Sequence, residues 1–326
     1  MAESFTWRDG DRTIRFGRGA VAEAASLLGA GYALFSTARG SAAAPAIAEA
    51  ASQVIDVPPG RVDDVSAVLL EALDDVDLPA DRPLVALGGG RVVDVTKSVA
   101  AALGGLEVAA VPTTLSAAEM TRSHRLPPGI DPKTPLVRPS LVLNDPELSA
   151  SQPVPELAGS AANALAHAVE ATATTHASPV PTLVARDASR RLAVAFGATE
   201  IDRDELALGA LLSGYALDAS GIGLHHVLAQ TLVRASRLPH GTVNAALLPH
   251  TIVALDRRGL LVDAATEHEL AVELAARADA RSLRAQGLLP ETIETAVAAA
   301  MLRPQLERTP PVPTADEVRA IYRAAW

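Results

Sequence analysis

The pattern of apolar residues changes near residue 152, and this change constrains the fold more than any other feature of the sequence. Before it, short apolar runs typical of buried strands alternate with stretches whose apolar residues recur at helical spacing. The strand-like runs are Tyr32–Ser36, Leu84–Leu87, Val108–Val111 and Ser140–Leu143. Strands that alternate with helices predict a parallel sheet covered by helices on both faces.

Three further segments of the first half have a predictable structure. Ala42–Val54 and Val65–Leu73 have the apolar spacing of helices. Phe5–Phe16 carries Asp9-Gly10-Asp11 between two alternating runs, which predicts a hairpin. We therefore expect an α/β domain over residues 1–152.

The second half is rich in Ala and Leu, and it shows helical spacing without a strand pattern. Proline-containing breaks at Ser178-Pro179, Leu238-Pro239 and Leu289-Pro290 separate the helical stretches. This predicts an all-helical domain over residues 153–326. Near its end, four prolines in Arg303–Pro313 predict an extended connection to a last short helix, Ala315–Ala325.

Composition excludes several classes of protein. Acidic residues outnumber basic ones by 38 to 28, and the resulting charge of −10 disfavours nucleic-acid binding, which needs a basic face. The absence of cysteine excludes disulfides, thiolate metal sites and a cysteine nucleophile. No apolar run reaches the roughly 18 residues of a membrane span, and the N-terminal residues do not resemble a signal peptide. We expect a soluble, cytoplasmic protein that acts on a small molecule, without nucleic-acid or membrane partners.

Gly88, Gly89 and Gly90 follow the strand-like run at Leu84–Leu87 and precede a helical pattern that contains Asp94. Glycines allow close approach of a ligand and a positive φ, and the N–H groups that open the helix can bind phosphate. A tight strand-to-helix turn is the alternative. Thr113, Thr114 and Ser116 follow the next strand, at the edge where ligands of open α/β sheets bind. An ordinary polar loop is equally consistent with these three residues.

Two groups of polar residues are candidates for contact with a substrate. Asn163 and His167 lie four residues apart on one helical face, and His226 and His240 stand in later motifs from which they could converge. Each histidine alone is more often packed or solvated than functional. Arg122, His124 and Arg125 follow the strand that ends in Pro-Thr-Thr, and they suit a carboxylate unless they form a solvated loop.

These motifs occur in the order found in iron-containing (group III) alcohol dehydrogenases. The stretches Asn163–Ala171 and Gly223–His226 are most similar to the maleylacetate reductase branch. The resemblance implies a Rossmann-like dinucleotide-binding domain, a helical domain, and an active site between them. It also implies hydride transfer between NAD(H) or NADP(H) and a carbonyl or alcohol carbon of a small, carboxylate-bearing substrate. We expect a homodimer.

The sequence motifs and the resemblance together assign roles residue by residue. Dinucleotide binding falls to Thr37, Arg39, Gly88, Gly89, Gly90, Asp94, Thr113, Thr114 and Ser116. The family's metal ligands correspond to Asn163, His167, His226 and His240, with Asn163 where the family has an aspartate. The histidines would polarise the substrate oxygen through zinc or iron(II), or donate to it directly. The strand end at Thr37 carries no acid, and Arg39 suits a 2′-phosphate, so NADP(H) should be accepted.

Two other functions remain open at this point. The first is a tailoring dehydrogenase that acts on a carrier-bound or peptide-bound hydroxy compound, which the unusual segment Met120–Pro139 would favour. The second is a family member that binds a ligand without chemistry, which the missing aspartate would favour. The intact glycines and three intact histidines argue against the second.

Overall fold

The computed structural model describes residues 3–73, 78–79, 81–150 and 152–326. The chain divides into two compact units, a first unit of residues 1–151 and a second unit of residues 152–326. Each unit has hydrophobic clusters of its own.

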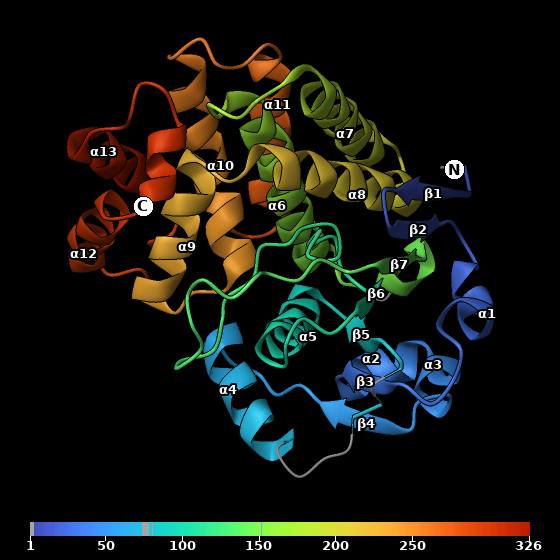
Figure 1. The fold of residues 1–326 in the computed structure, drawn as a ribbon. Coiled ribbons are helices and arrows are strands. Elements are labelled where there is room, and N and C mark those ends of the chain that lie inside the picture. The colour runs from blue at the N-terminus through green and yellow to red at the C-terminus, as the bar shows by residue number, and fades with distance from the viewer. Residues whose placement is uncertain (1–2, 74–77, 80, 151) are drawn as a thin grey trace. The chain divides into compact units, whose positions relative to one another are not determined.

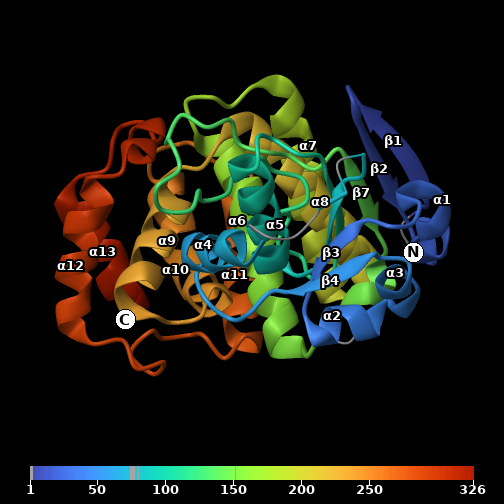
Figure 2. The ribbon, with the colours of Figure 1, turned by 60° about the horizontal axis from the view of Figure 1, so that its bottom comes forward.

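The first unit is built on one seven-stranded sheet in the order β1-β2-β7-β6-β5-β3-β4. Its strands are β1 (Phe5–Asp9), β2 (Arg12–Phe16), β3 (Ala33–Ser36), β4 (Gln53–Asp56), β5 (Leu84–Gly88), β6 (Val108–Pro112) and β7 (Leu141–Asn144). β1 and β2 form the expected hairpin at one end of the sheet, as Figure 2 shows, with Phe5 opposite Phe16. Every other pair of neighbouring strands is parallel.

Helices cover both faces of this sheet (Figure 1). Alternate strand residues such as Phe35 and Ala86 pack against α4 (Val62–Leu73) and α5 (Gly90–Ala102). Their neighbours Leu34 and Val85 pack on the other face, which is covered by η1 (Ala20–Glu23), α1 (Ala24–Leu28), α2 (Ala38–Ala43) and α3 (Pro45–Glu49). Because side chains alternate along a strand, a sheet buried on both faces needs continuous apolar runs.

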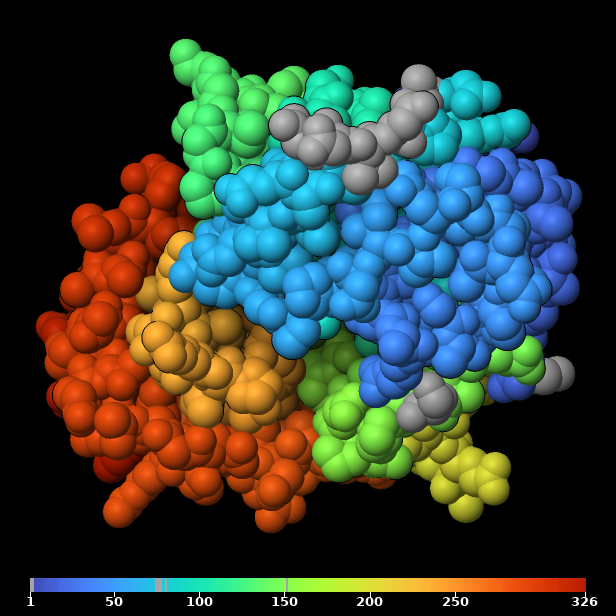
Figure 3. Space-filling model, turned by 90° about the horizontal axis from the view of Figure 1, so that it is seen from below, coloured from blue at the N-terminus to red at the C-terminus, as the bar shows by residue number. Residues whose placement is uncertain are grey.

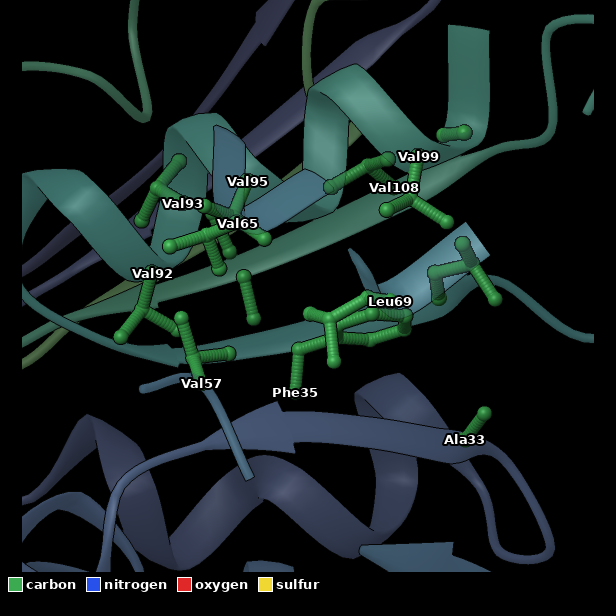
Figure 4. Packing of buried hydrophobic residues seen from close by; sticks show 14 of the residues in the cluster. Ala33, Phe35, Val57, Val65, Leu69, Val92, Val93, Val95, Val99 and Val108 are labelled. Atoms are coloured by element: carbon green, nitrogen blue, oxygen red, sulfur yellow. The ribbon is translucent and has the colours of Figure 1, made fainter. Parts of the chain in front are cut away.

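The core under α4 and α5 consists mainly of branched aliphatic side chains. Figure 4 shows Val92, Val95 and Val99 of α5 in this cluster, together with Phe35 and Leu69. The opposite side of α4 faces solvent, and Val68 is exposed there. Figure 3 shows α4 at the surface in light blue. The predicted α/β class of the first half is therefore confirmed.

The prediction of one helix over Ala42–Val54 is wrong. The chain forms two short helices, of which the second starts at Pro45, and then strand β4. Proline fixes φ and lacks an N–H group, so it begins a new helix rather than continuing one. β4 escaped detection because it is a four-residue strand at the end of the sheet, too short to show a pattern.

The described part of the second unit contains helices and no strand. They are α6 (Val154–Ala173), α7 (Pro179–Gly197), α8 (Arg203–Ser220), α9 (Leu224–Ser236), α10 (His240–Asp256), α11 (Ala264–Arg277), α12 (Pro290–Met301), η3 (Pro304–Arg308) and α13 (Ala315–Ala325). The 3-10 helix η2 (Pro146–Ser149) precedes them in the first unit. This confirms the predicted helical class of the second half.

α6 is the central helix of the second unit and packs against α7, α8, α9, α10 and α11. It is buried on nearly every side, as expected of a helix rich in alanine with few charges. At Gly159 the backbone of α6 meets Gly241 near the start of α10; a Cβ atom on Gly159 would lie 3.4 Å from the Gly241 backbone. This close approach brings the first turn of α10 to α6.

The connection over Arg303–Pro313 is not entirely extended, because η3 forms within it. The last helix has the predicted bounds. It begins with a capping box in which Thr314 and Glu317 satisfy each other's backbone N–H groups.

No single helix of the described residues is long and apolar enough to cross a membrane. α8 and α9 meet the criteria of length and composition only when taken together, with a bend of 99° between them.

Candidate active site

Helices α6 and α9 bring together Asn163, His167 and His226, three of the four residues that correspond to the family's metal ligands. We call these three residues the histidine cluster. The rings of His167 and His226 stack with centroids 4.7 Å apart. The Asn163 amide contacts both, with Nδ2 3.3 Å from His167 Nε2 and Oδ1 3.4 Å from His226 Nε2. The spacing of four residues on α6 therefore places Asn163 and His167 on one face, as predicted.

Glu170, which the sequence analysis did not single out, orients His226. Its Oε2 accepts a hydrogen bond from His226 Nδ1 at 2.6 Å, and its Oε1 accepts the backbone N–H of His226 at 3.1 Å. Burial alone would raise the pKa of Glu170, but the charge of His226 and these hydrogen bonds outweigh it, and the pKa is lowered. Glu170 is thus a buried carboxylate. An acid within an alanine-rich, apolar helix is the signal that would have identified it.

The Glu170 carboxylate fixes the tautomer of His226. With the Nδ1 proton directed at Glu170, Nε2 is the nitrogen that faces the rest of the cluster. Nε2 lies opposite Asn163 Oδ1, which is an acceptor, so a second proton on Nε2 would complete a hydrogen bond there. Glu170 therefore holds Nδ1 of His226 and leaves Nε2 as the nitrogen available to exchange a proton.

His167 and His240 complete the set of predicted catalytic histidines. Burial, and then the neighbouring His226 and His240, lower the pKa of His167 well below its ordinary value, so the ring is neutral. Its Nδ1 is buried without a hydrogen-bond partner among the described residues. His240 is the first residue of α10 and is exposed.

A second buried network ties α9 to the start of α10. His225 Nε2 lies 2.9 Å from Asn244 Oδ1, and its Nδ1 lies 2.9 Å from Thr251 Oγ1. Asn244 Nδ2 donates to the carbonyl of His240, so Oδ1 must accept from His225 Nε2. Burial lowers the pKa of His225 to about 3, and the neutral ring therefore accepts from Thr251 at Nδ1. This network holds the first turn of α10 against α9.

The cluster does not fit a tightly held metal ion. The side chain of Asn163 is a neutral amide, whereas an anionic ligand at this position would favour the binding of a divalent cation. Its N–H group also donates a hydrogen bond to His167 Nε2, which occupies the lone pair that a metal ion would need. Across the described ranges, no three His, Cys, Asp or Glu side chains are arranged to hold a metal ion.

The glycine loop joins β5 to α5 in the first unit, but the positive φ angles expected of its glycines are not found. None of Gly88, Gly89 and Gly90 has a positive φ, and Gly89 is extended at φ −76°. Crowding explains two of them: a Cβ atom would lie 2.7 Å from Val92 at Gly88 and 2.7 Å from Ser116 at Gly90. The glycines thus allow close packing against α5 and the loop after β6.

The ends of β3, β5 and β6 bring the predicted nucleotide-binding residues together. Thr113 donates its backbone N–H to the Gly88 carbonyl at 3.0 Å, and a Cβ on Gly89 would lie 3.1 Å from Thr114. Thr37 caps α2 by accepting the N–H of Gly40, which packs against the end of β5. Arg39 is exposed on α2. These residues share the carboxyl edge of the sheet, where ligands bind in such folds.

Asp94 has an internal partner rather than a free carboxylate. Its Oδ1 lies 2.8 Å from Nζ of Lys97, which is fully buried. Lys97 also donates to the carbonyls of Ala118, Thr121 and Ser123 at 2.9 to 3.0 Å. The Asp94–Lys97 pair therefore fastens the loop after β6 to α5, and this accounts for Asp94 without a cofactor.

His124 does not fit its predicted role in carboxylate binding. Its Nε2 accepts the backbone N–H of Val137, and its Nδ1 lies 3.2 Å from the carbonyl of Arg125. Burial, followed by the charge of Lys97, lowers the pKa of His124 to about 4, so the ring is neutral. Its two nitrogens serve the backbone of the segment. Arg122 and Arg125, on either side, are exposed.

Comparison with known proteins agrees with this arrangement. Residues 157–326 match the C-terminal model of the Fe-containing alcohol dehydrogenase family. Over 275 residues the chain is 33% identical to maleylacetate reductase of Sphingobium indicum, covering 77% of this chain and 74% of that protein. The chain belongs to the iron-containing alcohol dehydrogenase family.

Solved structures of the family place the chain in its maleylacetate reductase-like branch. The crystal structure of maleylacetate reductase from Agrobacterium tumefaciens superposes with a TM-score of 0.80 at 28% identity, covering 100% of this chain and 99% of that one. The enzyme from Rhizobium sp. gives 0.79, also at 28% identity. The fold and the family resemblance are thereby confirmed, and this family member is an oxidoreductase.

Proposed function

We propose that this enzyme transfers a hydride between a nicotinamide dinucleotide and the carbonyl or alcohol carbon of a small, carboxylate-bearing substrate. The observation that carries the proposal is the buried Glu170–His226 pair, which presents His226 Nε2 within the histidine cluster. A histidine held by a carboxylate in this way is suited to general acid–base catalysis. Maleylacetate, the compound named by the relatives, is the first substrate to test.

In the direction of reduction, a bound reduced nicotinamide would supply the hydride to the carbonyl carbon. The carbonyl oxygen takes the proton from His226 Nε2, and the Glu170 carboxylate stabilises the imidazolium before that transfer. His240 donates a second hydrogen bond to the oxygen as negative charge develops on it. The products are the alcohol and the oxidised dinucleotide; in the reverse direction His226 accepts the proton.

The residues that would hold the dinucleotide lie at the carboxyl edge of the sheet in the first unit. Gly88–Gly90 would hold its pyrophosphate, because the N–H groups that open α5 are not used within the helix and can bind a phosphate. Thr114 and Ser116, which pack against these glycines, supply hydroxyl groups to it. Because the end of β3 carries Thr37 and exposed Arg39 and no acid, NADP(H) is accepted as well as NAD(H).

The cofactor choice is tested by fluorescence titration of NADH and NADPH. We expect the dissociation constants of NADH and NADPH to lie within about a hundredfold of each other, which is a difference in binding free energy of roughly 2.7 kcal/mol. A stronger preference for NADH would contradict the role given to Arg39.

The catalytic assignment is tested by following oxidation of NADH and NADPH in the presence of maleylacetate, with wild type and Glu170→Gln. We expect turnover by the wild type and a kcat lower by roughly tenfold to a hundredfold in the variant, because a neutral amide in place of the carboxylate no longer stabilises the imidazolium. Dinucleotide affinity should not change. The control is Glu269→Gln, an exposed acid on α11. Full activity of Glu170→Gln, or dinucleotide binding without turnover of any carbonyl in a broad panel, would overturn the proposal.

A further inference from the structure

Arg303 lies beside the turn of α9 that follows His226. Its Nη2 donates to Oε1 of Gln230, one helical turn after His226, at 3.1 Å. The segment that follows Arg303 runs along α9 toward its start, where Thr309 accepts the N–H of Leu224 at 2.9 Å. His226 therefore lies on α9 between the two points at which this segment is attached.

No carboxylate among the described residues balances the charge of Arg303. Its only hydrogen bonds to described residues are to two amide oxygens, Gln230 Oε1 and Gln305 Oε1. Burial, and then the positive charge of Arg234, lower the pKa of Arg303, and no carboxylate raises it. By contrast, Arg191, a partly buried arginine on α7, pairs with two carboxylates. A half-buried cation beside a second cation is unfavourable unless an anion joins them.

The two glutamines hold the guanidinium in a fixed orientation and leave Nη1 without a partner among the described residues. A guanidinium presents its N–H groups in a planar fork that matches the two oxygens of a carboxylate. Because the amides are neutral, they orient Arg303 without cancelling its charge. The site is therefore suited to an oxyanion.

We propose that Arg303 binds the carboxylate of the carbonyl substrate. This inference rests on the proposed function, because it takes His226 as the group that contacts the carbonyl oxygen. Residues four apart on a helix lie roughly 5–6 Å from each other. A carboxylate at Arg303 and a carbonyl at His226 would thus belong to one oxo acid with only a few carbons between the two groups.

The test compares two aldehydes of the same length, succinic semialdehyde, which carries a carboxylate, and butanal, which does not. In Arg303→Gln we expect KM for succinic semialdehyde to rise at least about tenfold, the loss of a charged hydrogen bond. KM for butanal and the dissociation constant of the dinucleotide should stay within about twofold of wild type. Arg303→Lys, which keeps the charge but loses the fork, should show a smaller rise for succinic semialdehyde only.

The control variant is Arg323→Gln, which changes an exposed arginine on α13. It should leave both KM values unchanged. Thermal melts of all variants identify any loss of folding. If Arg303→Gln does not fold, the KM values of Arg303→Lys alone decide whether the inference holds. A KM that rises equally for both aldehydes, or for neither, overturns the inference. A weaker affinity for the dinucleotide also overturns it, because the anion would then be a cofactor phosphate.

A binding measurement separates this inference from the proposed function. Calorimetry with succinate measures carboxylate binding to the dinucleotide-loaded protein without turnover. If the wild type reduces none of the three compounds (the two aldehydes and maleylacetate), the proposed function fails. The carboxylate site would still be supported if Arg303→Gln binds succinate at least tenfold more weakly than the wild type. Equal succinate binding by both proteins, or no binding to the wild type, overturns the role of Arg303.

Discussion

Asn163 determines what the histidine cluster can hold. Its amide lies between His167 and His226 and hydrogen-bonds to the first, so the cluster contains no anion that would attract a dication. Replacing the amide with a carboxylate supplies that charge at nearly unchanged volume. Asn163 differs from an aspartate at this position by one side-chain atom, a nitrogen in place of an oxygen.

We predict that Asn163→Asp binds zinc at least about tenfold more tightly than the wild type, a gain of about 1.4 kcal/mol. Calorimetric titration with zinc measures the difference, and Asn163→Ala serves as the control that removes the amide without adding charge. Elemental analysis of the wild type provides the counter-test. About one equivalent of zinc or iron after purification without added metal, together with loss of activity on chelation, would show that the histidines act through a metal.

Glu267 on α11 is a buried acid outside the candidate site. It accepts a hydrogen bond from Ser189 Oγ at 3.1 Å, and burial raises its pKa to about 7. Between its ordinary pKa of about 4.5 and about 7, the folded protein holds a proton there that the unfolded chain has lost. The stability that this proton contributes is fully present below pH 4.5 and is lost as the pH rises through 7.

We predict that Glu267→Gln raises the melting temperature at pH 8 and leaves it nearly unchanged at pH 5. The neutral amide mimics the protonated acid at both pH values. The gain in the free energy of unfolding at pH 8 is therefore at most about 3 kcal/mol, which corresponds to the raised pKa of Glu267. Thermal melts at the two pH values measure it. Glu269→Gln, an exposed acid on the same helix, should show neither effect. An equal shift at both pH values would mean that Glu267 is ionised in the folded protein throughout.

At the scale of elements, Lys97 joins α5 to the loop after β6. Its buried ammonium group is the common donor to three carbonyls of residues 118–123 and also faces Asp94. The polar residues after β6 therefore owe their positions to a side chain on the preceding helix. Ala117, within this loop, has a left-handed backbone at φ 58°, which is uncommon for alanine and is held by the surrounding packing.

We predict that Lys97→Met lowers the free energy of unfolding by at least about 3 kcal/mol, because buried carbonyls lose their donor. Urea denaturation measures the loss. Lys133 is the only other lysine of the chain and is exposed, so Lys133→Met is a matched control that should change stability little. Amine labelling followed by mass spectrometry gives an independent result: the folded protein should react at Lys133 and not at Lys97. Rapid labelling of Lys97 would contradict its burial.

At the scale of the whole molecule, the sheet of the first unit ends in a strand with one unpaired edge. β1 pairs with β2 on one side and with no other strand of the sheet. An exposed strand edge is a site at which a second copy can add backbone hydrogen bonds, and most oligomers of soluble proteins are two-fold symmetric.

We predict a homodimer, with a mass by light scattering of twice the 33.6 kDa of the chain. Hydrogen exchange over a dilution series then tests whether the β1 edge forms the interface, since its amides should exchange faster as the dimer dissociates. A mass of 33.6 kDa at all concentrations would contradict the prediction. A dimer whose β1 amides exchange at a constant rate would place the interface elsewhere.

The sequence by itself determined the fold class of each half and the shared face of Asn163 and His167. Helical and strand periodicities arise from backbone geometry within a few residues, so they can be read locally. β4 was missed because four residues at the end of a sheet carry too little of that signal.

Only the tertiary structure decided which side chains meet. Glu170 pairs with His226 across 56 residues of sequence, Lys97 reaches carbonyls 21 to 26 residues ahead, and Arg303 bonds to Gln230 from 73 residues away. It also showed that the glycines of the loop relieve crowding rather than adopt a positive φ. Such contacts depend on how whole helices pack and in which register, and no local periodicity encodes that register.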